Sequence, residues 1–134
     1  YVGHLRGLFD DASGIYTPLS DARMKKDVEQ AENVLEKIAR LAVKRYRFTG
    51  DTNGTRKNYG LLAQEVEQLF PEIVSHVTTD DGKDTYTLNY AAFGVLAIKA
   101  IQERQHLIDA QQEEINALKQ VVVQLSTAKT KGNK

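Results

Sequence analysis

The apolar residues between Met24 and Ala42 alternate in steps of four and three, which is the spacing of one face of an amphipathic helix. Acidic residues fill the first half of this segment, and Lys37 and Arg40 lie near its end, as the helix dipole favours. The pattern therefore predicts a helix over residues 24–42. Its apolar face would consist of Met24, Val28, Ala31, Leu35, Ile38 and Ala42.

Shorter elements are predicted for the middle of the chain. Residues 42–48 alternate in part between apolar and polar types, and residues 56–60 follow a loop of Gly-Asp-Thr-Asn-Gly, so both segments are predicted strands. Residues 63–70 are predicted to form a short helix that ends at Pro71. Its buried side would consist of Leu62, Val66 and either Leu69 or Phe70, and we expect surface or capping roles for Gln64 and Glu65.

The next two segments, 73–78 and 83–88, flank the sequence Thr-Asp-Asp-Gly. An Asp-Gly pair between two strand-like segments is the short-range signature of a β-hairpin turn, so we expect an antiparallel hairpin here. After it, residues 90 to about 127 contain no helix breaker except Gly94, and Asn89 is a suitable N-cap. A single long helix is therefore predicted.

This long helix carries an apolar heptad repeat. Four such heptads indicate a coiled coil with copies of the same chain. β-Branched residues at one core position with Leu at the other favour two strands, but the polar Arg104 and Gln111 put that rule in doubt. The alternative is a helix packed on the hairpin of its own chain, which suits residues 93–101 better than 108–125. The repeat consists of Ile101, Ile108, Ile115 and Val122, with Arg104, Gln111, Leu118 and Leu125 three positions further on.

Composition excludes several classes of function. Eighteen basic and eighteen acidic residues cancel, so the overall charge favours neither nucleic acid nor an anionic membrane as a partner. The chain has no cysteine, its three histidines lack zinc-binding spacing, and no Walker-type glycine loop is present, so we expect no metal and no cofactor. No apolar run approaches a membrane span and no secretory signal is evident, which is consistent with folding in a bacterial cytoplasm.

Candidate chemistry lies where the character of the chain changes. Residues 1–19 mix glycine, aromatic and polar types, which predicts short extended segments and turns. Directly afterwards, Ser20 and Lys25 are candidates for a nucleophile and its base, because a lysine amine can take the proton of a serine hydroxyl. Residues five apart on a helix point about 140° away from each other, so the pair requires Ser20 on non-helical backbone at or before the helix cap. Alternatively, Ser20 or Asp21 only caps the helix while Lys25 and Lys26 are solvated.

Three blocks of sequence resemble one known family. They are Ser20-Asp21-x-Arg23-x-Lys25, the run from Tyr59-Gly60-Leu61-Leu62-Ala63-Gln64-Glu65-Val66 to Phe70-Pro71, and Leu88-Asn89-Tyr90. With these blocks in the family's order, residues 20–128 resemble the C-terminal intramolecular chaperone domain of phage tailspikes and tail fibres, the endosialidase-type peptidase S74 family. The resemblance implies a homotrimer that assists the folding of an upstream fibre in the same polypeptide and then cuts itself off before the serine.

The resemblance also implies how the chain is divided. Residues 1–19 would be the C-terminal stub of the passenger fibre, 20–89 a globular chaperone part, 90–128 a coiled-coil helix and 129–134 a disordered tail. The fold would be α+β, with an N-terminal helix, short strands, a β-hairpin and a long C-terminal helix in a trimeric coiled coil. The trimer interface would consist of Ile101, Ile108, Ile115, Leu118, Val122 and Leu125.

In this family reading the scissile bond joins Leu19 to Ser20, and Ser20 and Lys25 form the dyad of a self-cleaving, single-turnover serine endopeptidase. Assembly would take place in the host cytoplasm, and the mature passenger would reside in the virion tail. We expect the Ser20–Lys25 geometry to be completed only in the oligomer, so that cutting waits for assembly. A non-catalytic trimerisation module that caps a fibre and stays attached is the alternative.

Overall fold

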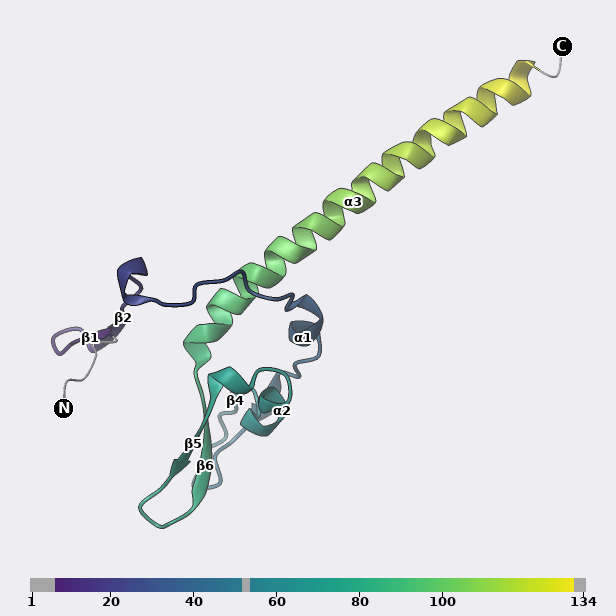
Figure 1. The fold of residues 1–134 in the computed structure, drawn as a ribbon. Helices are drawn as coiled ribbons and strands as arrows, with labels where there is room; N and C mark the ends of the chain where they lie inside the picture. Colours follow the sequence, from purple (N-terminus) through teal and green to yellow (C-terminus); the bar gives the residue numbers. More distant parts are fainter. Residues whose placement is uncertain (1–6, 52–53, 132–134) are drawn as a thin grey trace. The chain divides into compact units, whose positions relative to one another are not determined.

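The computed structural model describes residues 7–51 and 54–131, and these form two compact units divided between Ala31 and Glu32 (Figure 1). Within the described residues, three separate two-stranded antiparallel sheets, short helices and one long helix follow one another along the chain. The α+β fold class predicted from the sequence is therefore confirmed. Among the same residues, no helix combines the length and the apolar character needed to cross a membrane.

The first unit begins with a hairpin of β1 (Gly7–Asp10) and β2 (Ile15–Pro18). The Asp10 carboxylate organises the turn, because it accepts hydrogen bonds from the Ala12 amide and the Ser13 hydroxyl. Gly14 has a φ of 69°, a left-handed conformation that glycine adopts without strain. The extended segments and turn expected for residues 1–19 are confirmed over this hairpin, while residues 1–6 lie outside the described part.

The predicted helix over residues 24–42 is wrong in extent. A 3-10 turn, η1, covers Ala22–Met24, and the only α-helix in this stretch is α1 (Leu35–Ala39). Residues 25–34 are not helical, and Val28 on the predicted apolar face is 77% exposed. An amphipathic helix gains most of its stability from packing its apolar face, and none of the described residues of the first unit is buried.

α1 begins where it does because of a residue far along the chain. The carboxylate of Glu103 accepts hydrogen bonds from the Val34 amide at 2.9 Å and the Leu35 amide at 3.0 Å. These are amides at a helix start, which have no partner inside the helix. A carboxylate there also suits the positive end of the helix dipole. The start of α1 is therefore determined by a tertiary contact and not by the local sequence pattern.

The second unit continues with a small hairpin and a short helix. β3 (Lys44–Tyr46) pairs with β4 (Asn58–Gly60) in antiparallel register, and α2 (Ala63–Glu67) follows directly. The strands predicted over 42–48 and 56–60 therefore exist in shortened form. The 3-10 turn η2 (Pro71–Ile73) ends this part, with the proline at its first position.

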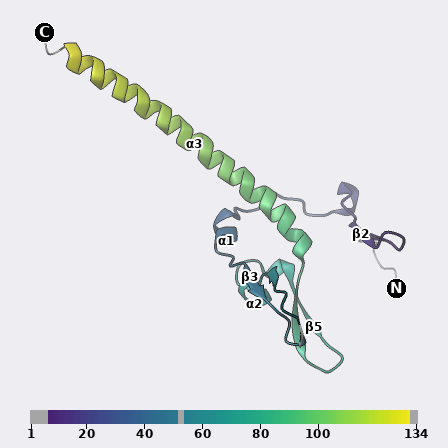
Figure 2. The same cartoon turned by 180° about the vertical axis from the view of Figure 1, so that it is seen from behind.

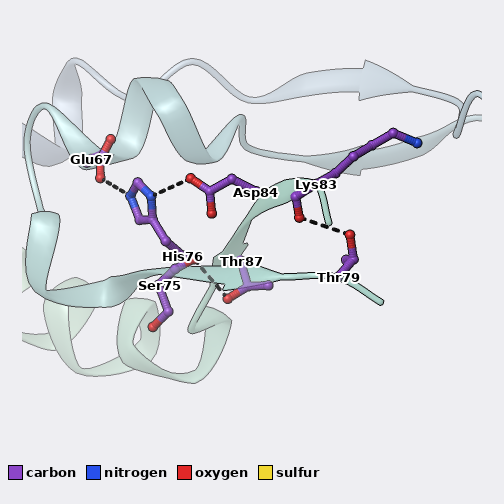
Figure 3. A network of polar contacts seen from close by, with 7 residues as sticks. All are labelled: Glu67, Ser75, His76, Thr79, Lys83, Asp84 and Thr87. Atoms are coloured by element: carbon purple, nitrogen blue, oxygen red, sulfur yellow. Dashed lines mark hydrogen bonds and ion pairs between the residues drawn. The ribbon is translucent and has the colours of Figure 1, made fainter. Parts of the chain in front are cut away.

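A second hairpin joins this part to the long helix. β5 (Val74–Thr78) pairs with β6 (Asp84–Leu88) across the predicted Thr-Asp-Asp-Gly turn, where Gly82 has a φ of 77°. Figure 3 shows His76 of β5 between two carboxylates: its Nε2 lies 2.6 Å from Glu67 of α2 and its Nδ1 lies 3.4 Å from Asp84 of β6. The hydrogen bond that Glu67 accepts, and after it the one that Asp84 accepts, raise the pKa of His76.

The hydrophobic core of the second unit is small. It consists of Val34, Val66, Phe70, Ile73 and Ala100, and Val66 and Phe70 are the most completely buried. Of the residues predicted for the buried side of the 63–70 helix, Leu62 is instead exposed. The core joins α1, α2 and the start of α3 into one unit.

The last element is α3 (Tyr90–Lys131), a single helix of 42 residues that includes Gly94 without interruption. α1 packs against its first turns, as both views show (Figures 1 and 2). From Arg104 to Lys129 every side chain is exposed. The helix extends to Lys131, past the boundary expected at residue 128, and the remainder of the expected tail, residues 132–134, lies outside the described part. Among the described residues of the second unit, most of α3 therefore packs on no other element.

Candidate functional site

The structure brings together Ser20 and Lys25, the candidate nucleophile and its base. The Lys25 Nζ donates a hydrogen bond to the Ser20 Oγ at 2.9 Å, and both residues are exposed. Ser20 directly precedes Asp21, the N-cap of the η1 turn, so it lies on non-helical backbone. This is the placement that the pair requires. The contact is present within a single chain, so the expectation that an oligomer is needed to complete this geometry is wrong.

A local turn produces the contact. The Asp21 side chain accepts a hydrogen bond from the Arg23 amide at 2.9 Å, and the Met24 amide donates to the Asp21 carbonyl at 3.0 Å. The Lys25 amide then donates to the Ala22 carbonyl at 3.1 Å, and Lys25 itself is extended, with φ −107° and ψ 146°. The tight turn followed by an extended residue brings the Lys25 side chain back to Ser20.

Asp21 and Arg23 also form an ion pair beside the Ser20–Lys25 pair. The Arg23 guanidinium contacts both carboxylate oxygens of Asp21, with the shortest distance 2.6 Å. The side-chain hydrogen bonds from Arg23, followed by the one from its amide, lower the pKa of Asp21, and the same carboxylate raises the pKa of Arg23. The two charges therefore satisfy each other close to the lysine.

The alternative interpretation from the sequence is correct in one respect. Asp21 is an N-cap, but it caps the three-residue turn and not a long helix. The Asp21–Arg23 ion pair was missed from the sequence, although an aspartate two residues before an arginine is visible in the motif. Glu65, for which a surface or capping role was expected, pairs with Lys44 at 3.1 Å.

The predicted trimer-interface residues all lie on α3 and are exposed in the single chain. Ile108 and Ile115 are about half exposed, and Val122 and Leu125 are about two-thirds exposed. An apolar row of this length on a helix without a partner is the pattern of a coiled-coil seam. Its oligomeric state stays a prediction. The row consists of Ile101, Ile108, Ile115, Leu118, Val122 and Leu125.

Glu103 of α3 helps to hold α1 against α3, because it accepts hydrogen bonds from the first amides of α1. Glu103 is nearly buried, and Lys99 lies 3.6 Å from it one turn earlier on α3. Burial raises the pKa of Glu103, but the hydrogen bonds from Val34 and Leu35 and the charge of Lys99 outweigh it, so the pKa is lowered overall. Among the described residues, no group of His, Asp or Glu side chains is arranged to hold a metal ion.

Comparison with known proteins places this geometry in context. The family model described as the chaperone of endosialidase, peptidase S74, matches residues 20–75, so the match begins at Ser20 itself. Long tail fiber proteins Gp37 of Enterobacteria phages M1 and Ox2 are each 38% identical over 104 residues, which is 75% of this chain and 38% of the relative. Gp37 of Salmonella phage S16 is 30% identical over 108 residues, 77% of this chain and 14% of the relative.

The chain thus spans little more than a third of the two phage relatives that it matches at 38% identity. The family match and the tail fibre relatives agree with the resemblance indicated by the sequence motifs. Residues 20–75 match the chaperone of endosialidase family, peptidase S74, and about three quarters of the chain is similar to phage long tail fiber proteins.

Proposed function

We propose that this chain is an intramolecular chaperone that trimerises through α3, assists the folding of an upstream phage tail fibre, and then releases itself by cutting between Leu19 and Ser20. The observation that carries the proposal is the 2.9 Å contact between the Lys25 Nζ and the Ser20 Oγ, at the first residue of the family match. The exposed apolar row on α3 supports trimerisation. The tail fibre relatives support a fibre as the passenger.

The cutting step follows from the positions of the two groups. The neutral Lys25 amine takes the proton of the Ser20 hydroxyl as the Oγ attacks the carbonyl carbon of Leu19. The bond between that carbon and the Ser20 nitrogen breaks, and the resulting lysine ammonium returns the proton to the departing amine. The product is an ester between Leu19 and the Ser20 Oγ. Water then opens the ester, which leaves a carboxylate on Leu19 and restores the serine hydroxyl.

The released passenger would become part of the virion tail, and assembly would take place in the host cytoplasm. No cofactor enters the proposed chemistry, because each step uses the serine, the lysine and water. The homotrimer and the upstream fibre of the same polypeptide are the proposed partners.

Mass spectrometry of the protein with its natural upstream segment tests the proposal. The parent is expected to release a fragment that begins at Ser20, while Ser20→Ala and Lys25→Ala stay intact. Lys26→Ala is the matched control, because it removes the same charge one position away and is expected to cut normally. A new terminus at any other residue, or equal loss of cutting for both lysine variants, contradicts the assignment.

A second candidate is a non-catalytic trimerisation module that caps the fibre and stays attached. The capping role of Asp21 favours it, because the turn is explained without any chemistry at Ser20. In that case the parent chain stays intact while the trimer forms. The same mass measurement, made on a sample whose trimeric state is established by sedimentation, separates the two functions.

A further inference from the structure

The Ser20–Lys25 contact depends on a turn that neither residue forms by its own side chain. Every hydrogen bond that shapes the turn begins or ends at residues 21–25. The other bonds of the turn join backbone atoms, and the Asp21 side chain caps its amino end by accepting from the Arg23 amide. Three-residue 3-10 turns have poor hydrogen-bond geometry, so they depend on such support.

The negative charge of Asp21 must also be kept from interacting with Lys25. A free carboxylate close to a lysine favours the charged ammonium, and an ammonium cannot take a proton from serine. Here the Arg23 guanidinium occupies the Asp21 carboxylate, with contacts of 2.6, 3.1 and 3.2 Å. Among the contacts of the described residues, the Lys25 Nζ has the Ser20 Oγ as its partner and no carboxylate.

We propose that Asp21 and Arg23 are positioning residues for the Ser20–Lys25 pair: Asp21 caps the turn that brings Lys25 back to Ser20, and Arg23 occupies the Asp21 carboxylate so that it does not compete for the lysine. Neither residue touches the scissile bond in this role. The inference rests on the proposed function for its biological meaning, but the geometry it describes can be measured without any cutting.

The absence of cysteine from the chain allows a direct test. In a Ser20→Cys variant of the full chain, the new thiol is unique, and its alkylation by iodoacetamide reports how much thiolate is present. A lysine ammonium in contact with the thiol stabilises the thiolate. Adding Lys25→Ala is therefore expected to slow alkylation at neutral pH by about fivefold. This is the effect of raising the thiol pKa by somewhat less than one unit.

Variants at Asp21 then separate positioning from charge. Adding Asp21→Ala is expected to slow alkylation about as much as Lys25→Ala does, because the cap is lost and Lys25 moves away. Asp21→Asn keeps an oxygen that can accept from the Arg23 amide and carries no charge to be neutralised, so it is expected to retain at least half of the rate. Arg23→Gln is expected to slow alkylation at least twofold, because the freed Asp21 carboxylate then draws the Lys25 ammonium away from the thiol. Asp11→Ala, in the exposed turn of the first hairpin, is the control for loss of one negative charge.

The outcomes distinguish this inference from the proposed function. Alkylation that falls with Lys25→Ala but not with Asp21→Ala overturns the positioning role, even if the parent chain cuts itself. Equal loss in Asp21→Ala and Asp21→Asn also overturns it, because capping would then not be the cause. Alkylation that follows the expected order in a chain that never cuts supports the positioning role while it contradicts autoproteolysis.

Discussion

Placing charge in the apolar row of α3 is the sharpest test of assembly. Ile108 and Ile115 lie seven residues apart, and in the single chain they are 48% and 45% exposed. Fully burying such a side chain contributes about 1.5–3 kcal/mol, so covering the exposed half contributes about 1 kcal/mol per residue. In the proposed trimer, the two positions in three chains together contribute about 6 kcal/mol of association free energy.

The double variant Ile108→Asp with Ile115→Asp removes this contribution and adds a penalty of several kcal/mol for each carboxylate that would be buried. We expect it to be monomeric by sedimentation equilibrium at concentrations where the parent is trimeric. The matched control is Ala110→Asp with Ala117→Asp. It introduces the same charges with the same spacing on the opposite side of the helix, and it is expected to stay trimeric.

Circular dichroism of both double variants shows whether α3 itself survives, so loss of helix is not mistaken for loss of association. A trimeric Ile108→Asp, Ile115→Asp protein would refute the assignment of these residues to the seam. Dissociation of the Ala110→Asp, Ala117→Asp protein to the same extent would show that charge alone, and not burial in the seam, governs assembly.

Three further predictions concern the second unit. Phe70→Ala is expected to lower the free energy of unfolding by about 3–5 kcal/mol in urea titrations, because Phe70 fills the small core. The raised pKa of His76 means that its contacts with Glu67 and Asp84 stabilise the fold below the unfolded pKa of about 6.5 and cease to do so as pH rises through the folded pKa. The melting temperature of the parent should therefore fall relative to that of His76→Gln between pH 6 and pH 9. The pKa of Glu103 is lowered in the folded state. Its contribution to stability is therefore present above the unfolded pKa and lost as pH falls through the folded pKa. Glu103→Gln should accordingly flatten the acid limb of the curve of stability against pH.

Elements whose signals are local were predictable from the sequence. The Asp-Gly turn identified the β5–β6 hairpin, and the predicted strand bounds differ from the observed ones by at most one residue. This is possible because the turn of a hairpin is specified by the residues that form it. The long helix was predictable because nothing but Gly94 interrupts its helix-forming residues.

The error at residues 24–34 has a different origin. Helical periodicity is a signal that a segment can bury one face, and it does not state that a surface for that face exists. The start of α1 depends on Glu103, which lies 69 residues from Val34 in the chain. The contact between His76 of β5 and Glu67 of α2 likewise joins two elements that no local pattern connects. Contacts of this kind appear only when the elements are placed in three dimensions.

The Ser20–Lys25 contact is itself local, and this changes how a delay in cutting can work. Its supporting hydrogen bonds all lie within residues 20–25, so an unassembled chain already holds the two groups 2.9 Å apart. A checkpoint on assembly must therefore act on something other than this distance. Both side chains are exposed in the single chain, whereas a lysine acts as a base in its neutral amine form, which burial favours. If assembly covers the turn, desolvation favours the neutral amine and activates the pair. We accordingly expect the monomeric Ile108→Asp, Ile115→Asp variant to keep its Ser20–Lys25 contact, measured by alkylation of the thiol that Ser20→Cys introduces, and to lose cutting when Ser20 is retained. Cutting at the parental rate by that monomer would show that covering the turn is not required.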